Sequence, residues 1–206
     1  MGKTIAIVNQ KGGVGKTTSC VNLAAALTAL GARVLVCDFD PQGNATSGFG
    51  LDKGRSPSVY DVILGDAPMS KAVIHTKWGD VVPANKALSG ATVELIALER
   101  REFRLKDAIE EVKGSYDVIF IDCPPSLELL TLDGLCAADT LLVPVQCEYY
   151  ALEGLSDLLY TVRLAKQRLN PSLELEGVVL TMYDGRTNLS LQVAEEVKRH
   201  FPGKVY

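Results

Sequence analysis

The stretch KTIAIVNQKGGVGKTT, residues 3–18, joins a strand pattern to a glycine-rich loop and the start of a helix. Lys3–Asn9 is a largely apolar run, typical of a strand buried on both faces of a parallel sheet. The end of the loop, Gly15-Lys16-Thr17, matches the close of the phosphate-binding pattern G-x-x-x-x-G-K-[ST]. Gln10 stands where that pattern has its first glycine, and Lys11 adds a second lysine. The stretch predicts a site for nucleotide phosphates, with one lysine left to explain.

Strand and helix patterns alternate along the rest of the chain. We expect strands over residues 33–38, 116–122, 139–145 and 175–182, and helices over 17–30, 58–66, 151–169 and 190–201. A further short helix should follow residue 69, an amphipathic helix should end at 114, and 81–84 and 92–98 read as strands or extended pieces. Residues 40–54 are polar and rich in turn formers. This alternation predicts an α/β fold: a doubly wound, mainly parallel sheet with helices on both faces.

Length and composition favour one domain. The chain has 206 residues, a net charge of −4 and no apolar run long enough to span a membrane. The start has no signal-peptide pattern, so we expect a cytoplasmic protein. The last four residues, GKVY, look like the opening of another strand. We therefore expect residues 1–206 to form a single P-loop domain that is truncated at its C-terminus.

The charge argues against a protein that binds nucleic acid through a basic surface at all times. Residues 151–206 carry seven Lys+Arg and seven Asp+Glu, so any surface for DNA would be a local patch. The five cysteines include no C-x-x-C pair and lie in apolar contexts, which indicates core residues rather than a zinc or redox site. His75 and His200 have no metal-like partners in the sequence.

Two acidic segments would lie beside the glycine loop, because the carboxyl ends of parallel strands meet at one edge of the sheet. YDVIFID ends in Asp122, the arrangement of a Walker B aspartate that holds Mg²⁺ directly or through water. Thr17 would offer its hydroxyl to the same ion, and Lys16 would neutralise the β- and γ-phosphates. In CDFDPQ, Asp38 could lie in the second layer of groups around the magnesium ion, and Asp40 could orient a water toward the γ-phosphate.

Taken together, these motifs resemble the deviant Walker A ATPases, and specifically the ParA/Soj partition ATPases. The resemblance is carried by KGGVGKTT (11–18), DFDPQGNATSG (38–48), FIDCPPS (120–126) and PVQCEYYALEGL (144–155), and it covers essentially the whole chain. In that family ATP lies between two subunits, and the extra lysine, matching Lys11, reaches the partner's nucleotide. The family extends some forty to fifty residues further than this chain.

The resemblance also implies roles for single residues. Asp40 matches the water-orienting aspartate, Glu148 an acidic residue near the nucleotide at the dimer interface, and Arg186 an arginine for non-specific DNA binding. Catalytic roles are implied for Lys11, Lys16 and Asp40, and magnesium contacts for Thr17, Asp38, Asp40 and Asp122. The implied ATP-binding residues are Lys11, Gly12, Gly13, Val14, Gly15, Lys16, Thr17, Thr18, Pro124, Glu148 and Met182.

The function that the resemblance implies is DNA segregation. ATP and Mg²⁺ would close a homodimer that binds double-stranded DNA on the nucleoid, without contact with a membrane. Hydrolysis, intrinsically weak and stimulated by a ParB/Spo0J-like centromere-binding protein, would release the DNA.

Other functions use the same loop. A MinD-like membrane switch would need a C-terminal amphipathic helix, and none is visible in the sequence. An iron–sulfur carrier would need grouped cysteines, which are absent. A monomeric metabolic enzyme, such as a dethiobiotin-synthetase-like ligase, would bind ATP without needing Lys11.

Overall fold

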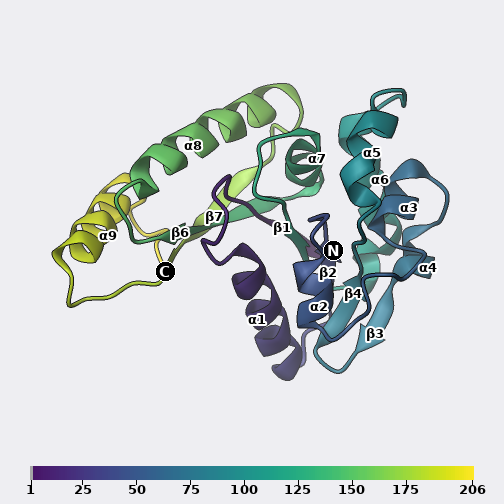
Figure 1. Cartoon of the computed structure of the whole chain (residues 1–206), viewed down its shortest axis with the longest axis horizontal. Coiled ribbons are helices and arrows are strands. Elements are labelled where there is room, and N and C mark those ends of the chain that lie inside the picture. The colour runs from purple at the N-terminus through teal and green to yellow at the C-terminus, as the bar shows by residue number, and fades with distance from the viewer. Residues whose placement is uncertain (1) are drawn as a thin grey trace.

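The computed structural model describes residues 2–206, and for residues 152 and 153 it describes the backbone alone. The described residues form a seven-stranded sheet in the order β3-β4-β2-β5-β1-β6-β7, flanked by helices (Figure 1). The strands are β1 (Lys3–Ile7), β2 (Val34–Asp38), β3 (Ile74–Thr76), β4 (Gly79–Val82), β5 (Val118–Asp122), β6 (Thr140–Gln146) and β7 (Glu174–Thr181). β3 pairs antiparallel with β4, and the other pairings are parallel. The predicted doubly wound, mainly parallel sheet is confirmed.

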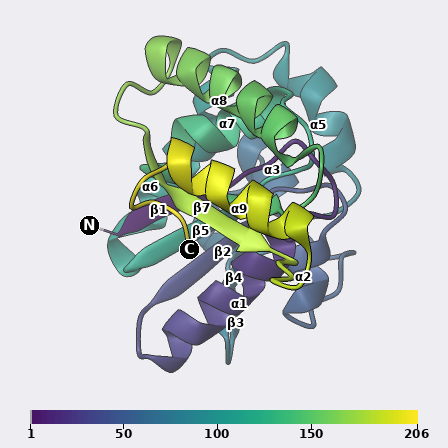
Figure 2. The same ribbon diagram turned by 90° about the vertical axis from the view of Figure 1, so that its left-hand side faces the viewer.

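Helices cover the two faces of the sheet unequally. The α-helices are α1 (Lys16–Ala29), α2 (Asn44–Gly48), α3 (Val59–Leu64), α4 (Met69–Ala72), α5 (Leu88–Leu95), α6 (Arg104–Val112), α7 (Leu129–Ala137), α8 (Ala151–Arg168) and α9 (Asn188–His200). Two 3₁₀ turns, η1 (Arg101–Phe103) and η2 (Lys113–Ser115), flank α6. One apolar cluster joins the sheet to α3–α9, and a second joins the opposite face to α1 and α2. Figure 2 shows α8 and α1 on opposite sides of the sheet.

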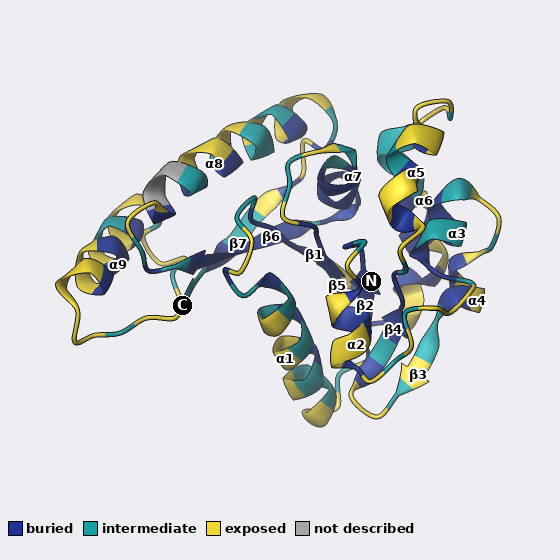
Figure 3. Cartoon of the chain, viewed as in Figure 1, coloured by how far each residue is buried: buried dark blue, intermediate teal, exposed yellow. Residues whose placement is uncertain are grey.

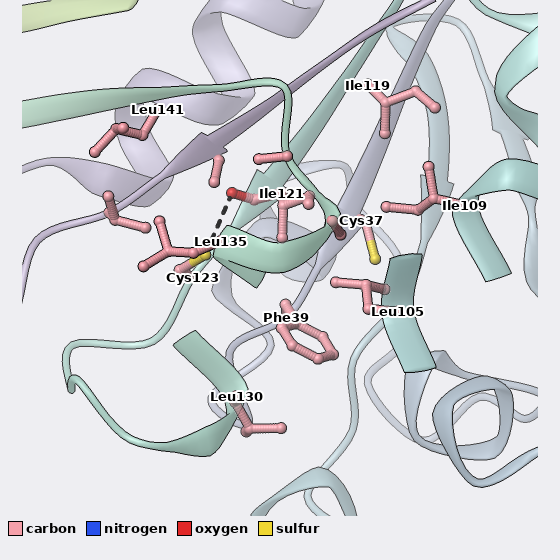
Figure 4. Close-up of a cluster of buried hydrophobic side chains, with 14 of the residues drawn as sticks. Cys37, Phe39, Leu105, Ile109, Ile119, Ile121, Cys123, Leu130, Leu135 and Leu141 are labelled. Atoms are coloured by element: carbon pink, nitrogen blue, oxygen red, sulfur yellow. Dashed lines mark hydrogen bonds between the residues drawn. The ribbon is translucent and has the colours of Figure 1, made fainter. Parts of the chain in front are cut away.

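The central strands lie in the interior, which is why they read as continuous apolar runs. Every residue of β2 is buried, and the sheet is dark along its middle in Figure 3. On the larger face, Cys37 and Ile121 point toward Leu105 of α6 and Leu135 of α7 (Figure 4). All five cysteines are free and buried, as their apolar contexts predicted. Of the helices formed by the described residues, none has the length and apolar character needed to cross a membrane.

The sequence patterns misled in the segment between β2 and α6. Residues 92–98 were expected to be extended, but the first four of them lie in α5. The reason is the helical spacing of Leu88, Ala91 and Leu95, which bury one stripe and override the β-branched pair Thr92-Val93. The polar stretch 40–54 contains the short helix α2, and the edge strand β3 was not expected.

The last residues of the chain lie beside β7. Val178 N–H donates to Lys204 O at 2.7 Å, and Tyr206 N–H donates to Val178 O at 2.9 Å. Val178 and Val205 form a parallel bridge. Residues 204–206 are therefore extended, as expected for GKVY, whereas Gly203 lies in the turn before them with a φ of 73°.

Candidate functional site

Three adjacent strands, β2, β5 and β1, end together at one edge of the sheet. Their register places Asp122 of β5 between Asp38 of β2 and Ile7 of β1. The glycine loop follows β1 directly and leads into α1, which begins at Lys16. The predicted phosphate loop, Walker B strand and acidic segment therefore meet, at the edge where doubly wound folds bind ligands.

The loop has the backbone that its glycines allow. Gly13 has a φ of 76° and Gly15 a φ of 90°, a left-handed region that other residues rarely adopt. Gly15 also lies against β7, since a Cβ added there would come within 3.3 Å of Thr181 Cγ2. The Thr181 hydroxyl donates to Val14 O at 2.8 Å. The loop is thus fixed by α1, which follows it directly, and by its contacts with Thr181 of β7.

Lys16 is buried in the loop, with 6% of its surface exposed. Its Nζ donates to Lys11 O at 2.9 Å. Burial lowers the pKa of Lys16, while Asp122 and Asp40 raise it. Because α1 starts at this residue, the positive end of the helix dipole adds to the lysine charge. The arrangement suits the binding of an anionic phosphate group.

The two strand-end carboxylates differ in their hydrogen bonds. Asp38 accepts from the backbone N–H and the hydroxyl of Thr46, both at 2.7 Å. Neither oxygen of Asp122 accepts a hydrogen bond of standard geometry from the described residues, and the side chain is fully buried. Burial raises the pKa of Asp122 to about 7, with a further contribution from Asp38. Burial likewise raises the pKa of Asp38 to about 6. Two carboxyl groups with raised pKa values are therefore held at the strand ends, with Lys16 as the nearby positive charge that partly offsets the shift at Asp122.

The residues fit a bound magnesium ion. The orphaned oxygens of Asp122 face Thr17, whose hydroxyl stabilises the charged carboxylate. Among the described residues, no group of three or more His, Cys, Asp or Glu side chains could hold a metal ion by itself. Mg²⁺ commonly takes only one or two carboxylates and completes its shell with phosphate and water, so a site of this kind needs no closed cage.

A cavity of about 280 Å³ opens in front of the loop. Its lining consists of Gly12, Gly13, Gly15, Lys16, Thr17, Thr18, Asp40, Gln42, Asn44, Pro125 and Met182. Asp40 thus faces the same cavity as Lys16, and its own Oδ1 accepts from Gln42 N–H at 2.9 Å. This position is compatible with the water-orienting role predicted for Asp40.

Lys11 does not line this cavity. Its ammonium forms an ion pair with Glu148, which follows β6, and the two side chains are 38% and 31% exposed. Tyr149 and Tyr150 come next, 76% and 63% exposed, with their rings edge to face at 5.1 Å. The second lysine of the loop is therefore held by a carboxylate outside the residues that line the phosphate cavity, and two exposed tyrosines follow that carboxylate in the sequence.

The remaining predicted residues lie at different distances from the site. Met182 lines the cavity, with a positive φ of 51° and 58% exposure. Pro124 is buried, and its neighbour Pro125 reaches the cavity instead. Arg186 is exposed in the turn before α9, where its guanidinium forms two short contacts with Asp184, at 2.7 and 2.8 Å. No bound group tests these roles, and they stay predictions.

Several residues that shape the site were not found by sequence reasoning. Asn9 donates to Pro144 O at 2.8 Å and accepts from Lys11 N–H at 3.0 Å, which ties the start of the loop to β6. Thr46 satisfies Asp38 and also accepts from Ala84 N–H at 3.0 Å. Gln42, Asn44 and Pro125 line the cavity. A polar residue inside an otherwise apolar strand end, as at Asn9, is the one signal that could have been used.

Comparison with known proteins agrees with this geometry. A family profile described as an AAA domain matches residues 2–175. The sporulation initiation inhibitor protein Soj of Bacillus subtilis is 57% identical over 209 residues, covering 100% of this chain and 83% of that protein. The chromosome partitioning protein ParA of Myxococcus xanthus is 51% identical and covers 100% of this chain and 74% of that protein. The chain belongs to the ParA/Soj family.

Solved structures of similar proteins match the ParA/Soj chain over nearly its full length. A Mycobacterium smegmatis protein described as cobyrinic acid a,c-diamide synthase, with bound ADP and magnesium, has a TM-score of 0.93 at 44% identity, covering 98% of this chain and 83% of that one. A plasmid partition protein of Borrelia burgdorferi bound to AMPPNP has a TM-score of 0.86 at 26% identity, covering 100% and 83%. The ParA/Soj chain is thus an ATPase that uses ATP and Mg²⁺ and converts ATP and water to ADP and phosphate.

Proposed function

We propose that this partition ATPase is a switch in which Mg-ATP closes a homodimer and the dimer binds duplex DNA. Hydrolysis, slow in the free protein and stimulated by a ParB-like centromere-binding partner, reopens the dimer and releases the DNA. The protein acts in the cytoplasm, on the nucleoid. The proposal is supported by the curated relatives, which are named for chromosome partitioning, and by the arrangement of the two lysines.

In this proposal the phosphate cavity does the chemistry within one protomer. Lys16 neutralises the β- and γ-phosphates, and Thr17 and Asp122 hold Mg²⁺. Asp38, beside Asp122 on the neighbouring strand, supports the magnesium site without binding the ion directly. Asp40 orients the attacking water, a task that needs a positioned acceptor more than a strong base. When bound, Mg²⁺ would supply positive charge that offsets the negative charge developing on the phosphate oxygens.

The observation that carries the dimer is the position of Lys11. Lys16 already serves the cavity, while the Lys11 ammonium lies outside it and is still partly exposed. A lysine supplied by a second copy could offset charge on the transferring phosphoryl group, as an arginine finger does in trans. The exposed Tyr149 and Tyr150 beside it provide the aromatic surface typical of an interface centre. Glu148 and Met182 would then lie near the nucleotide.

DNA binding is assigned to the side of the molecule that carries α8 and α9. The last turns of these helices contain Lys166, Arg168, Lys198 and Arg199, and Arg186 lies in the turn before α9. Arg186 exchanges its contact with Asp184 for DNA phosphates. Binding through phosphates has no sequence preference and weakens steeply with salt, because condensed counterions are released. Pairing two such surfaces in a dimer strengthens binding, which makes DNA affinity depend on ATP.

The first experiment is the solution mass of Asp40→Ala protein with Mg²⁺ and either ATP or ADP. We expect a dimer with ATP, a monomer with ADP, and loss of the dimer when Lys11→Ala is added. Salt-dependent retention of the ATP dimer on duplex DNA is the second measurement. A monomer under both conditions, with ATP shown to be bound, contradicts the proposal and favours a metabolic enzyme, the class named for the Mycobacterium structure.

A further inference from the structure

One wall of the phosphate cavity is held by a lysine that lies behind it. Lys53 Nζ donates to Gln42 O at 2.5 Å and to Asn44 Oδ1 at 3.3 Å. Gln42 and Asn44 line the cavity, whereas Lys53 is not among its lining residues. The ammonium group of Lys53 therefore contacts the wall of the site rather than the space where phosphate would bind.

The residues that Lys53 holds are the ones that fix Asp40. The Gln42–Gly43 peptide group is bonded at both ends, because its carbonyl accepts from Lys53 and its N–H donates to Asp40 O at 2.8 Å. Gln42 N–H also donates to Asp40 Oδ1 at 2.9 Å. From the described residues, no hydrogen bond of standard geometry reaches the other carboxylate oxygen of Asp40, so that oxygen is available to a water molecule.

Packing fixes the Lys53 side chain against this wall. Gly43 has a φ of 61°, and a Cβ added there would come within 3.1 Å of Lys53 Cδ. Leu51 N–H donates to Thr46 O at 3.1 Å, which folds the segment after α2 back toward its beginning. A positive charge at the start of a helix is unfavourable, so stabilising α2 does not account for the ammonium.

We propose that Lys53 is a positioning residue for ATP hydrolysis, which holds the Gln42–Gly43 peptide group so that the Asp40 carboxylate keeps the orientation that the attacking water needs. This inference rests on the water-orienting role proposed for Asp40. Lys53 acts through the peptide group and touches no reacting atom. Its loss should therefore lower kcat and leave the KM for ATP nearly unchanged, because Lys16 and the glycine loop hold the phosphates.

The first test is steady-state hydrolysis of Mg-ATP. Lys53→Met keeps most of the side-chain stem and removes the ammonium, and it should lower kcat by about 5- to 30-fold with KM within about twofold. Lys53→Arg keeps a positive donor at this position and should recover most of the loss. Lys71→Met is the matched control, since it removes an exposed lysine of α4 and should leave both constants within about twofold.

A second readout needs neither nucleotide nor magnesium. Amide hydrogen exchange, followed by NMR in the ligand-free protein, reports how firmly residues 42 and 43 are held. Lys53→Met should speed exchange at Gln42 and Gly43 by about three- to tenfold, and Lys53→Arg should stay close to the wild type. Arg33 N–H, which donates to Asp117 at 2.9 Å on the opposite edge of the sheet, is the internal reference and should not change.

A double variant tests whether Lys53 acts through Asp40. In the Asp40→Ala background, Lys53→Met should change the residual hydrolysis rate by less than about twofold, because the carboxylate that the lysine positions is already gone. An equal loss in both backgrounds would show that Lys53 acts by another route, and the inference would be wrong.

The remaining outcomes separate this inference from the role of Asp40. If Asp40→Ala hydrolyses ATP at the wild-type rate, the water-orienting role is wrong, and the role of Lys53 falls with it. If Asp40→Ala is impaired but Lys53→Met keeps its kcat, Lys53 is not a positioning residue and the role of Asp40 stands. Unchanged exchange at Gln42 and Gly43 in Lys53→Met also overturns the inference.

Discussion

The two ends of β5 hold an aspartate each, and the two residues behave in opposite ways. Asp117, directly before the strand, receives Arg33 Nη2 at 2.7 Å and Arg33 N–H at 2.9 Å. Hydrogen bonding to Arg33 lowers the pKa of Asp117 to about 2. Asp122, the last residue of the strand, is buried without a hydrogen-bond partner of standard geometry among the described residues, and burial raises its pKa to about 7. One strand therefore carries a satisfied carboxylate at one end and an unsatisfied carboxyl at the other.

The same contrast extends across the sheet. At the amino edge, Asp139 receives Lys113 and Thr4 N–H, and Asp80 receives His75 and the hydroxyl of Tyr116. At the carboxyl edge, Asp38 and Asp122 stand side by side with raised pKa values. These two carboxyl groups also lie beside Lys16 and the phosphate loop, and buried groups with perturbed pKa values next to a cavity indicate a binding site. The amino edge is arranged for stability and the carboxyl edge for binding.

The largest predicted effect breaks this contrast at Asp122. Asp122→Asn should lower Mg-dependent ATP hydrolysis by about 10- to 100-fold, because the ion loses a charged partner. In Mg-free buffer the raised pKa of Asp122 means that wild-type stability falls as pH rises from about 4 to about 7, since the unfolded chain loses this proton first. The asparagine variant lacks that loss, and at pH 8 its free energy of unfolding should be higher by on the order of 2–4 kcal/mol.

Steady-state phosphate release and urea unfolding at pH 5 and pH 8 check both parts. If Asp122→Asn hydrolyses ATP normally, Asp122 does not hold magnesium. If Asp122→Asn is less stable than the wild type at pH 8, the buried Asp122 carboxylate does not destabilise the ligand-free protein.

An intermediate effect is expected at Asp133, a buried carboxyl outside the nucleotide edge. This residue of α7 accepts Leu105 N–H at 3.2 Å, its second oxygen has no hydrogen-bond partner among the described residues, and burial raises its pKa to about 8. Wild-type stability should therefore fall from about pH 4 to about pH 8, whereas Asp133→Asn should show a flatter profile over that window.

The measurement is urea unfolding at pH 5, 7 and 9 in the presence of Mg-ATP. Because the nucleotide site is then occupied, the pH dependence of the free energy of unfolding reports on Asp133 rather than on Asp122. ATP hydrolysis should change little. If hydrolysis fell as far as expected for Asp122→Asn, Asp133 would also contribute to the nucleotide site, and the contrast between the carboxyl edge and the rest of the molecule would be wrong.

The smallest effect is expected at the amino end of β5. Asp117→Asn removes an exposed pair whose contribution is present above about pH 4 and is lost as pH falls through about 2, because Arg33 lowers the pKa of Asp117. A slightly lower melting temperature should result, and the difference should vanish in about 1 M salt, where exposed charges are screened. ATP hydrolysis should equal that of the parent. A salt-independent loss, measured by calorimetry, would show that the pair does more than hold two surface charges.

The sequence predicted the strands well because their information is local. The apolar composition of runs such as YDVIFID and RVLVCD is enough to indicate a buried strand, and both runs end in an aspartate of the site. It predicted α5 wrongly, since the stripe of Leu88, Ala91 and Leu95 competes with two β-branched residues, and only packing decides between them. Contacts between distant residues were beyond reach. The pairing of Lys11 with Glu148 and the bond from Thr181 to Val14, 167 positions away, depend on how the finished sheet brings its ends together.

The position of β1 has a consequence for the order in which the protein can be made. β1 precedes its neighbours β5 and β6 in the chain and lies between them in the sheet, where Lys3 pairs with Val118 and Ile5 pairs with Thr140. Its backbone and its apolar side chains therefore have no sheet partners until the residues of β5 and β6 have been synthesised. Until Thr181 arrives to hold Val14, the glycine loop cannot take its final support either. Such distant pairings form slowly. A growing chain of this protein would thus present an unpaired central strand and an unfinished ATP site to the cell's chaperones.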